Sequence, residues 1–232
     1  MKEMLSNRIL TVLPAEDFSR LLPFLEPVSL SLGERLMGSG EVAQFVYFPE
    51  STILSSHSDM QDGKSVEVGM IGKDGVAGLS AIFGPAQSIH SLNVNIPGSA
   101  LRMNAHDFQQ EFERTPALRR TVLNYAGQYI AQVSQRSACG ILHRTEQRLA
   151  VWLLMLTERL DSDTVEITQE RIAEHLGVRR AGITVIAGEL QTRGIIANSR
   201  GSLRIIDRRA LEAISCECYH SLSQARKQAS RY

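Results

Sequence analysis

Two adjacent arginines, Arg179 and Arg180, stand where a glycine turn gives way to an amphipathic helix. Guanidinium groups at such a position can pair with phosphates and can donate two parallel hydrogen bonds to the edge of a guanine. The surrounding chain is basic, because residues 179–209 contain seven arginines and only two acidic residues. This stripe indicates a surface that neutralises nucleic-acid phosphates, although a solvated basic face would have the same composition.

Two short helices must position these arginines, in the segment ITQERIAEHLGVRRAGITVIAGELQTRG at residues 167–194. Thr168 can cap the first helix and Gly177 can end it. The apolar residues of the second helix follow the i, i+3, i+4, i+7 pattern of one buried face, so the opposite face is free to enter the major groove of DNA. The predicted DNA contacts are Thr168, Gln169, Arg179, Arg180, Ala181, Thr184, Val185 and Arg200.

A short β-hairpin is predicted directly after these helices. The stretch RGIIANSRGSLRIID, residues 193–207, contains two apolar runs joined by NSRGS, which places Arg200 at the tip. A helix-turn-helix followed by a basic hairpin is a winged helix. The plainer alternative is a helical hairpin followed by an unrelated β-hairpin. A further helix is expected from Arg208 to about Ala225.

The chain before this module divides into two parts. Turn signals alternate with short β-rich runs over residues 28–104, which predicts an all-β sandwich or roll of the jelly-roll or double-stranded β-helix type. From residue 116 to about 140 the periodicity becomes helical, with Pro116 in the first turn. The expected fold class is therefore α+β, with a β-roll sensor domain at 1–115, a long dimerisation helix at 116–142, and a winged helix with a C-terminal helix at 143–232.

The long helix has two apolar stripes. Because one stripe packs on the β-domain, the other needs a second partner, and a copy of the same helix is the simplest candidate. The alternative is a helix buried between the protein's own two domains. We predict a homodimer whose seam is the stripe Leu118, Val122, Tyr125 and Tyr129. The neighbouring stripe is Leu123, Ala126, Ile130 and Val133.

In the order of its elements and in local motifs the chain resembles the CRP/FNR family of bacterial transcription regulators. The resemblance covers about residues 10–206 and is carried by GERLMGSGEVAQFVYFPEST in the roll, by RTEQRLAVWLL, and by ITQERIAEHLGVRRAGITVIAGELQTRGII. It implies a β-roll of the cyclic-nucleotide-binding type, a dimerisation helix and a winged helix. It also implies a homodimeric regulator that binds an inverted repeat in double-stranded DNA and contacts RNA polymerase.

One departure from the family concerns the effector. Family members that bind cyclic nucleotides carry a Gly-Glu pair and then an Arg-Ser or Arg-Thr pair, whereas residues 75–101 here contain no Asp, Glu, Lys or Arg. A phosphate buried without a cation is costly, so we expect that cyclic AMP is not the effector and that any ligand is apolar or neutral. His90 is interpreted as a satisfied core histidine rather than a haem ligand.

The recognition helix and the cysteines depart from the family as well. Typical members place Glu and, four residues later, Arg where this chain has Ala181 and Val185, so we expect a different operator with methyl contacts to thymine. The N-terminal cysteines of iron–sulfur members are missing. Cys139, Cys216 and Cys218 are interpreted as reduced thiols, because residues two apart in a helix point away from each other. A thiol switch is the alternative.

Composition narrows the remaining functions. The chain has 232 residues, 43% of them hydrophobic, and its net charge is zero. The charges are unevenly distributed, because residues 1–140 contain 11 basic and 14 acidic residues whereas residues 141–232 contain 14 basic and 11 acidic residues. No apolar run has signal-peptide or membrane length, and few cysteines fit a reducing compartment, so we expect a cytoplasmic protein without a membrane partner. Known catalytic motifs are missing from the sequence, so we expect that the protein is not an enzyme and has neither a cofactor nor a metal site. The alternative function is an effector-binding or protein-interaction module with a degenerate winged helix.

Overall fold

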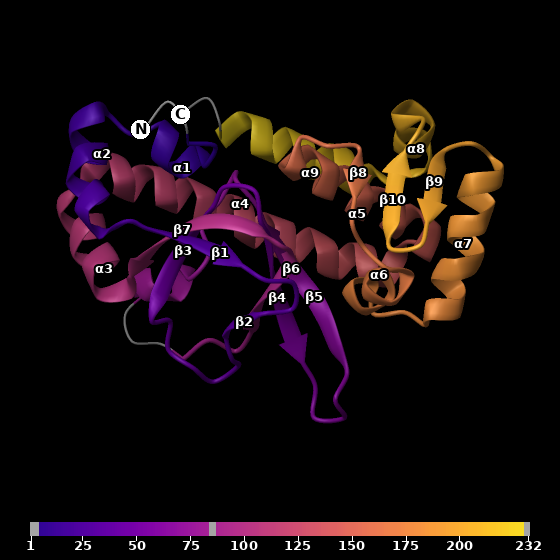
Figure 1. The fold of residues 1–232 in the computed structure, drawn as a ribbon, viewed down its shortest axis with the longest axis horizontal. Helices are drawn as coiled ribbons and strands as arrows, with labels where there is room; N and C mark the ends of the chain where they lie inside the picture. Colours follow the sequence, from indigo (N-terminus) through magenta and orange to yellow (C-terminus); the bar gives the residue numbers. More distant parts are fainter. Residues whose placement is uncertain (1–4, 84–86, 230–232) are drawn as a thin grey trace.

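The computed structural model describes residues 5–83 and 87–229, and shows two halves along one long axis (Figure 1). Strands with short helices form the N-terminal half, and helices with a small sheet form the C-terminal half. The long helix α4, Pro116–Leu142, runs along both. These elements confirm the predicted α+β class of β-roll, long helix and winged helix-turn-helix. None of the helices within the described ranges is long and apolar enough to cross a lipid bilayer.

Two antiparallel sheets make the roll. One sheet has the strand order β1-β7-β3 and the other has the order β2-β6-β4-β5. The chain therefore crosses between the sheets several times, as it does in a jelly roll. The strands are β1 (Glu26–Leu30), β2 (Arg35–Met37), β3 (Phe45–Pro49), β4 (Ile53–Asp59), β5 (Ser65–Ile71), β6 (Ser91–Ile96) and β7 (Gly98–Asn104).

A continuous hydrophobic core fills the roll. Phe48 of β3 meets Phe108 edge to face with ring centroids 6.1 Å apart, and both side chains are fully buried. Burial of an aromatic side chain of this size contributes about 2 kcal/mol to stability. The roll is flanked by three helices, α1 (Arg8–Thr11), α2 (Ala15–Leu21) and α3 (Ala105–Arg114).

Helix α4 packs one of its two apolar stripes on the roll, and this stripe is the one predicted to form the dimer seam. Leu118, Val122 and Tyr125 are buried in the core of the roll, and Tyr129 packs against that core. The Tyr125 ring fills the space beside Gly75, where a Cβ atom would lie 2.3 Å from the phenol oxygen. Leu118, Val122 and Tyr125 have almost no surface left for a second chain, and Tyr129 is only partly exposed, so the assignment of the seam to this stripe is wrong.

The C-terminal half is built around α5, in which residues 149–156 are all buried. A small antiparallel sheet of strand order β8-β10-β9 packs with two helices that lie between its first two strands in the sequence. The elements are α5 (Thr145–Leu160), β8 (Thr164–Val165), α6 (Gln169–Leu176), α7 (Arg180–Thr192), β9 (Ile196–Ser199) and β10 (Ser202–Ile205). This is the predicted winged helix.

The single helix expected after the wing is two helices in the structure. Helix α8, Arg208–Ile214, ends at Ser215, whose backbone is extended with φ −62° and ψ 153°. Helix α9, Glu217–Ala229, starts two residues later and runs back along α4 toward the roll (Figure 1). The break changes the direction in which the side chains around residue 216 point.

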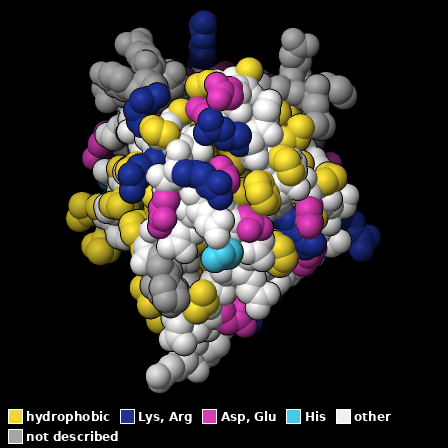
Figure 2. Space-filling model, turned by 90° about the vertical axis from the view of Figure 1, so that its left-hand side faces the viewer, with side chains coloured by type: hydrophobic (Ala, Val, Ile, Leu, Met, Phe, Trp, Pro, Cys, Tyr) yellow, Lys and Arg dark blue, Asp and Glu magenta, His cyan; other side chains and the backbone are white. Residues whose placement is uncertain are grey.

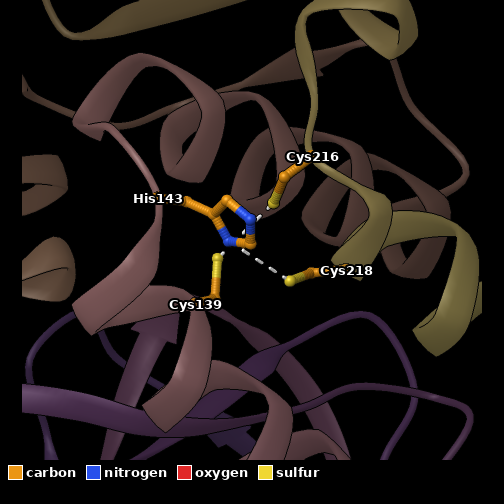
Figure 3. Close-up of side chains that lie close together, drawn as sticks. All are labelled: Cys139, His143, Cys216 and Cys218. Atoms are coloured by element: carbon orange, nitrogen blue, oxygen red, sulfur yellow. Dashed lines mark hydrogen bonds between the residues drawn. The ribbon is translucent and has the colours of Figure 1, made fainter.

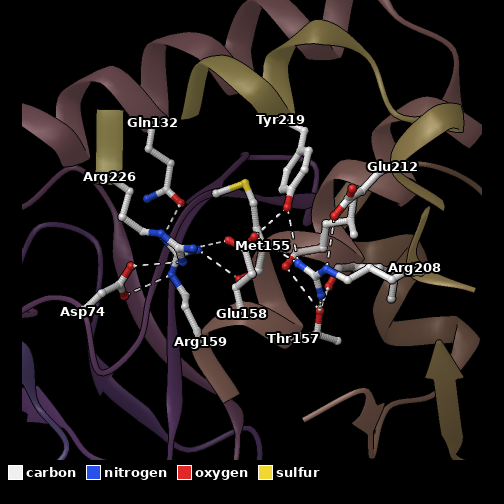
Figure 4. A network of polar contacts seen from close by, with 12 residues as sticks. Asp74, Gln132, Met155, Thr157, Glu158, Arg159, Arg208, Glu212, Tyr219 and Arg226 are labelled. Carbon is white, nitrogen blue, oxygen red and sulfur yellow. Dashed lines mark hydrogen bonds and ion pairs between the residues drawn. The ribbon is translucent and has the colours of Figure 1, made fainter. Parts of the chain in front are cut away.

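A polar network holds these last helices on α5 and α5 on the roll (Figure 4). Glu158 of α5 accepts a hydrogen bond of 2.6 Å from the Tyr219 hydroxyl of α9 and one of 3.0 Å from Arg208 of α8. The next residue, Arg159, places its Nε atom 3.1 Å from a carboxylate oxygen of Asp74 in the roll. One turn of α5 therefore joins the C-terminal helices to the N-terminal half.

The end of the molecule formed by the roll carries mixed charge. Figure 2 shows basic and acidic side chains close together on this face, among hydrophobic ones. A surface that binds DNA through its phosphates presents an excess of positive charge. The mixed charge of this face therefore gives no reason to place a nucleic-acid interface at this end of the molecule.

Candidate nucleic-acid interface

Helix α7 is held by one apolar face and presents the other to solvent. Ile183, Ala187 and Leu190 are buried at the i, i+4 and i+7 positions of a single face. The opposite face includes most of the predicted reading positions. Those that lie on or directly before α7 are all exposed: Arg179, Arg180, Ala181, Thr184 and Val185.

The turn before α7 is fixed by local signals in the sequence. Thr168 caps α6 by accepting a hydrogen bond from the backbone N–H of Arg171. Gly177 ends α6 in the left-handed conformation with φ 64°, which strains any residue that has a Cβ atom. A Cβ atom there would also lie 3.2 Å from Val66 of the roll, so the turn sits close to the N-terminal half.

Polar side chains at the start of the two helices pair with each other. A terminal nitrogen of Arg180 lies 3.5 Å from a carboxylate oxygen of Glu170, and both side chains are more than half exposed. Thr184 donates a 2.7 Å hydrogen bond to the amide oxygen of Gln169. An exposed ion pair is worth about 0–1 kcal/mol, so Arg180 can exchange its partner for a base or a phosphate at little cost.

The wing supplies the last predicted contact on a separate element. Arg200 is exposed in the tight turn between β9 and β10, next to Gly201, which adopts φ 82°. Of the two predicted contacts at the start of α6, Thr168 is exposed and Gln169 is half-buried. The structure thus brings Gln169, Arg180 and Thr184 together and places Arg200 on the hairpin.

A cleft separates the start of α7 from the roll. Its volume is about 1230 Å³, and it is lined by Arg35, Asp59 and Lys64 of the roll and by Arg179 and Ala181 of the winged helix. Two of the predicted DNA contacts, Arg179 and Ala181, therefore line an interdomain cleft. Any movement of the roll relative to the C-terminal half changes their surroundings.

Beside this cleft a buried carboxylate joins the two halves. The side chain of Glu67 on β5 is completely buried. It accepts hydrogen bonds from Arg136 of α4 (2.6 Å), Trp152 of α5 (3.1 Å) and Ser55 of β4 (2.6 Å). The Nδ1 atom of His175 on α6 lies 3.2 Å from the same carboxylate.

Burial raises the pKa of Glu67, but the positive charge of Arg136, the neighbouring imidazole of His175 and the hydrogen bonds outweigh it, so this pKa lies well below its usual range. Sequence reasoning did not single out Glu67. Its hydrogen-bond partner nearest along the chain, Ser55, is 12 residues away, and Trp152 is 85 residues away. No local pattern of residue types could have signalled this junction.

A small cavity lies inside the roll beside α4. It measures about 110 Å³, and its lining includes Ile71, Val76 and the imidazole of His90, with no Asp, Glu, Lys or Arg among the described residues. The hydroxyl of Tyr129 donates a 2.8 Å hydrogen bond to Ser56 at its wall. Pockets that bind drug-sized ligands are usually ~300 Å³ or larger.

The Nδ1 atom of His90 has no hydrogen-bond partner among the described residues, so this is not the satisfied core histidine that we expected.

Comparison with known families matches two parts of the chain. Residues 27–115 match the cyclic nucleotide-binding domain, and residues 147–214 match the Crp-like helix-turn-helix domain. The first match covers the roll and the second covers the winged helix, in the order that the structure shows. The chain belongs to the CRP/FNR family. As a member of this family it is a transcription regulator with a DNA-binding helix-turn-helix, and not an enzyme.

Several solved structures have the same fold. FixK2 from Bradyrhizobium japonicum aligns with a TM-score of 0.72 at 17% identity, over 83% of this chain and 98% of that one. A CRP-family transcriptional regulator from Thermus thermophilus gives 0.68 at 19% identity, over 81% and 96%. The c-di-GMP-responsive global regulator CLP from Xanthomonas campestris gives 0.68 at 13% identity, over 83% and 99%. A comparison with curated protein sequences found no match.

Proposed function

We propose that this CRP/FNR protein is a homodimer that recognises an inverted repeat in double-stranded DNA and regulates transcription through contact with RNA polymerase. The observation that carries the proposal is the exposed N-terminal half of α7. Arg180 is accessible there and, among the described residues, its guanidinium has only a surface ion pair to Glu170, while Val185 is 60% exposed. An exposed valine at the centre of a helix face has no packing role within this chain, whereas it can contact a thymine methyl group.

The two arginines of the interface have different roles. Arg180, near the start of the recognition helix, is placed to donate a bidentate hydrogen bond to guanine O6 and N7. Arg200, on the wing, is placed to contact the sugar-phosphate backbone or the minor groove. Arg180 then selects the sequence, and Arg200 positions the domain on the duplex.

The outer stripe of α4 supports the homodimer. Leu123, Ile130 and Ile141 are 47%, 62% and 83% exposed, although each is a large aliphatic residue. Together with small residues they follow a spacing that alternates between four and three along one face, as the seam of two packed helices does. The full stripe is Leu123, Gly127, Ile130, Ser134, Ser137 and Ile141, and all six residues are at least partly exposed.

This stripe also determines the symmetry of the DNA site. Two copies of α4 that pack on each other are related by a two-fold axis, which places the two winged helices symmetrically. Such a dimer meets half-sites that are inverted and lie about one helical turn, ~34 Å, apart. The small residues between the three aliphatic ones allow the two helices to approach closely.

We also propose that cyclic AMP is not the effector. Support comes from the uncharged lining and the small volume of the cavity in the roll. A cyclic phosphate placed there would lose its hydration and gain no cation. The structural neighbour CLP is described as responsive to c-di-GMP, so the fold alone does not imply cyclic AMP.

Selection of bound fragments from a random double-stranded DNA library, with the full-length protein, tests the proposal. The expected result is enrichment of one inverted repeat with half-sites about one turn apart, at an affinity that falls as salt is raised. Failure to enrich any sequence at low salt would overturn the proposal. It would favour the alternative of an effector-binding or protein-interaction module with a degenerate winged helix.

A further inference from the structure

Three cysteines and one histidine meet where the long helix ends (Figure 3). Cys139 and His143 lie one turn apart at the C-terminal end of α4, and Cys216 and Cys218 flank the start of α9. One ligand atom from each of these residues lies within 4.8 Å of the corresponding atoms of the other three. All three thiols are buried and none forms a disulfide.

The break between α8 and α9 produces this convergence. The expectation that Cys216 and Cys218 point apart assumed one continuous helix through both residues. Because Ser215 is extended and α9 begins at residue 217, Cys216 precedes the helix while Cys218 lies in its first turn. Both sulfur atoms therefore turn toward α4, and that expectation is wrong.

Two distances within the cluster match the edges of a tetrahedron around one ion. The Sγ atoms of Cys139 and Cys216 are 3.6 Å apart, and the Sγ atom of Cys218 is 3.6 Å from Nδ1 of His143. Zinc bonds of ~2.3 Å to sulfur and ~2.0 Å to nitrogen separate two sulfurs by ~3.8 Å and a sulfur and a nitrogen by ~3.5 Å in a tetrahedral site. A disulfide would require ~2.05 Å between the sulfurs.

We propose that these four side chains bind one Zn²⁺ ion in a closed Cys₃His site. Thiolate and imidazole are the ligands that zinc prefers, and four protein ligands leave no position for a substrate, so the site is structural. An iron–sulfur cluster is a poorer fit. Its ligands are distributed over two or four iron atoms, so the full set spans a wider distance than the 4.8 Å found here.

Groups around the four ligands are arranged as they are in zinc sites. The Nε2 atom of His143 lies 3.2 Å from a carboxylate oxygen of Glu217. A carboxylate on the outer nitrogen fixes the tautomer and leaves Nδ1, which faces Cys218, free to bind the ion. The amide nitrogen of Gln135 donates a 3.1 Å hydrogen bond to the sulfur of Cys218.

The charge around the cluster and a cavity that borders it also favour an ion at this position. Three thiolates around Zn²⁺ would carry a net charge of −1, which the guanidinium of Arg148, on the wall of the same cavity as Cys139, would partly offset. A cavity of about 200 Å³ borders both Cys139 and Arg148, and gives an ion a path to the cluster.

The position of the cluster indicates what the ion would do. All four residues lie outside the matched domains at 27–115 and 147–214, so the site is a feature of this chain rather than of either domain model. The cluster joins the last turn of α4 to α9, across the joint between α4 and α5. A bound ion would hold these helices as one rigid unit and fix the winged helix relative to the roll.

Titration of the reduced full-length protein with Co²⁺ in the absence of oxygen tests the proposal. The expected result is one Co²⁺ per chain, with thiolate charge-transfer bands and the intense d–d absorption of a tetrahedral site, which Zn²⁺ abolishes by displacement. Zinc should raise the Tm of the metal-free protein by roughly 5 °C or more. Cys216→Ser should lose the tetrahedral spectrum, whereas His220→Gln, an exposed control on the same helix, should keep it.

A second pair of variants keeps the test independent of folding. His143→Gln removes a ligand that is only partly buried, and Glu217→Gln removes only its outer carboxylate partner. Glu217→Gln should weaken zinc binding roughly 10-fold or more, and His143→Gln should weaken it further. The proposal is overturned if the folded, reduced protein binds no Co²⁺, or if Cys216→Ser keeps the spectrum. Formation of a Cys139–Cys216 disulfide in a protein that binds no metal when reduced would establish a thiol switch instead.

Discussion

The carboxylate of Glu67 in the roll lies 2.6 Å from the guanidinium of Arg136 on the long helix, and the Glu67 side chain has no exposure to solvent. Trp152 of the winged-helix half donates to the same carboxylate, and His175 of α6 lies beside it. One buried negative charge is therefore shared by the roll, the long helix and the DNA-binding half. Its loss should affect stability first and the placement of the winged helix second.

Replacement of Glu67 by glutamine should destabilise the protein by about 3 kcal/mol, because it leaves the guanidinium of Arg136 buried without its counter-charge. Urea unfolding followed by circular dichroism measures the change. Glu174→Gln, an exposed substitution on α6, is the control and should change the free energy of unfolding by less than ~0.5 kcal/mol. Equal effects of the two variants would show that the buried pair contributes nothing.

The stabilising effect of Glu67 should depend on pH. Its pKa is lower in the folded protein than in the unfolded chain, where glutamate has a pKa of ~4.3. The stabilisation is then complete above about pH 5 and declines as the pH falls through and below the unfolded value. The difference in unfolding free energy between the native protein and Glu67→Gln should shrink between pH 7 and pH 3.5. A constant difference would contradict an ionised Glu67 in the folded state.

Leu123→Glu combined with Ile130→Glu should convert the dimer to monomers. The two substitutions place like charges at the seam, where each would face its copy across the two-fold axis. Sedimentation velocity measures the mass. Leu32→Glu is a matched control on the roll, since Leu32 is 53% exposed, close to the 47% of Leu123. If the double variant sediments as an unchanged dimer, the interface lies on another surface.

Arg180→Ala should relax base preference at one symmetric pair of operator positions, with a loss of about 1–3 kcal/mol of discrimination. Binding to a library of operator variants measures this directly. An even loss of affinity with no change in base preference would show that Arg180 contacts a phosphate.

Arg200→Ala should weaken binding to all sequences alike. It should also reduce the dependence of log affinity on log salt by roughly one unit per half-site, because one phosphate contact is lost. Binding measured at several salt concentrations tests this. A change in base preference on loss of Arg200 would mean that the wing reads bases.

Cyclic AMP should neither bind nor change the affinity for DNA. The reason is the lack of any cation in residues 75–101, together with the small cavity that these residues help to line. Isothermal titration calorimetry is the direct measurement. Saturable binding at micromolar cyclic AMP would show that the roll accommodates the phosphate in another way.

Local periodicity was enough to predict the winged helix. The spacing of Ile183, Ala187 and Leu190 defines the buried face of α7, and Gly177 marks the turn before it. The face of the long helix that packs on the roll was harder to predict, because two neighbouring stripes are apolar and the sequence does not show which of them the roll covers. The larger aromatic stripe is covered because Tyr125 and Tyr129 fit against Gly75 and Gly69.

The junction and the cysteine cluster could not be predicted from local patterns. Glu67 follows a valine in a β-rich run, and such a residue usually faces solvent. Its burial depends on Arg136 and Trp152, which only the folded chain brings near it. The cluster depends on a break at Ser215, where the sequence has neither glycine nor proline to mark the end of a helix.

Helix α4 acts on the winged helix as a lever arm. With 27 residues it is ~40 Å long; the roll packs along it from Leu118 to Arg136, and the C-terminal half is attached at its far end. A tilt of only ~5° of the helix and the roll together would move the far end by ~3.5 Å, about the rise of one base pair along DNA. A displacement at the roll too small to disrupt its core would therefore be enough to change whether both recognition helices of a dimer fit into successive major grooves.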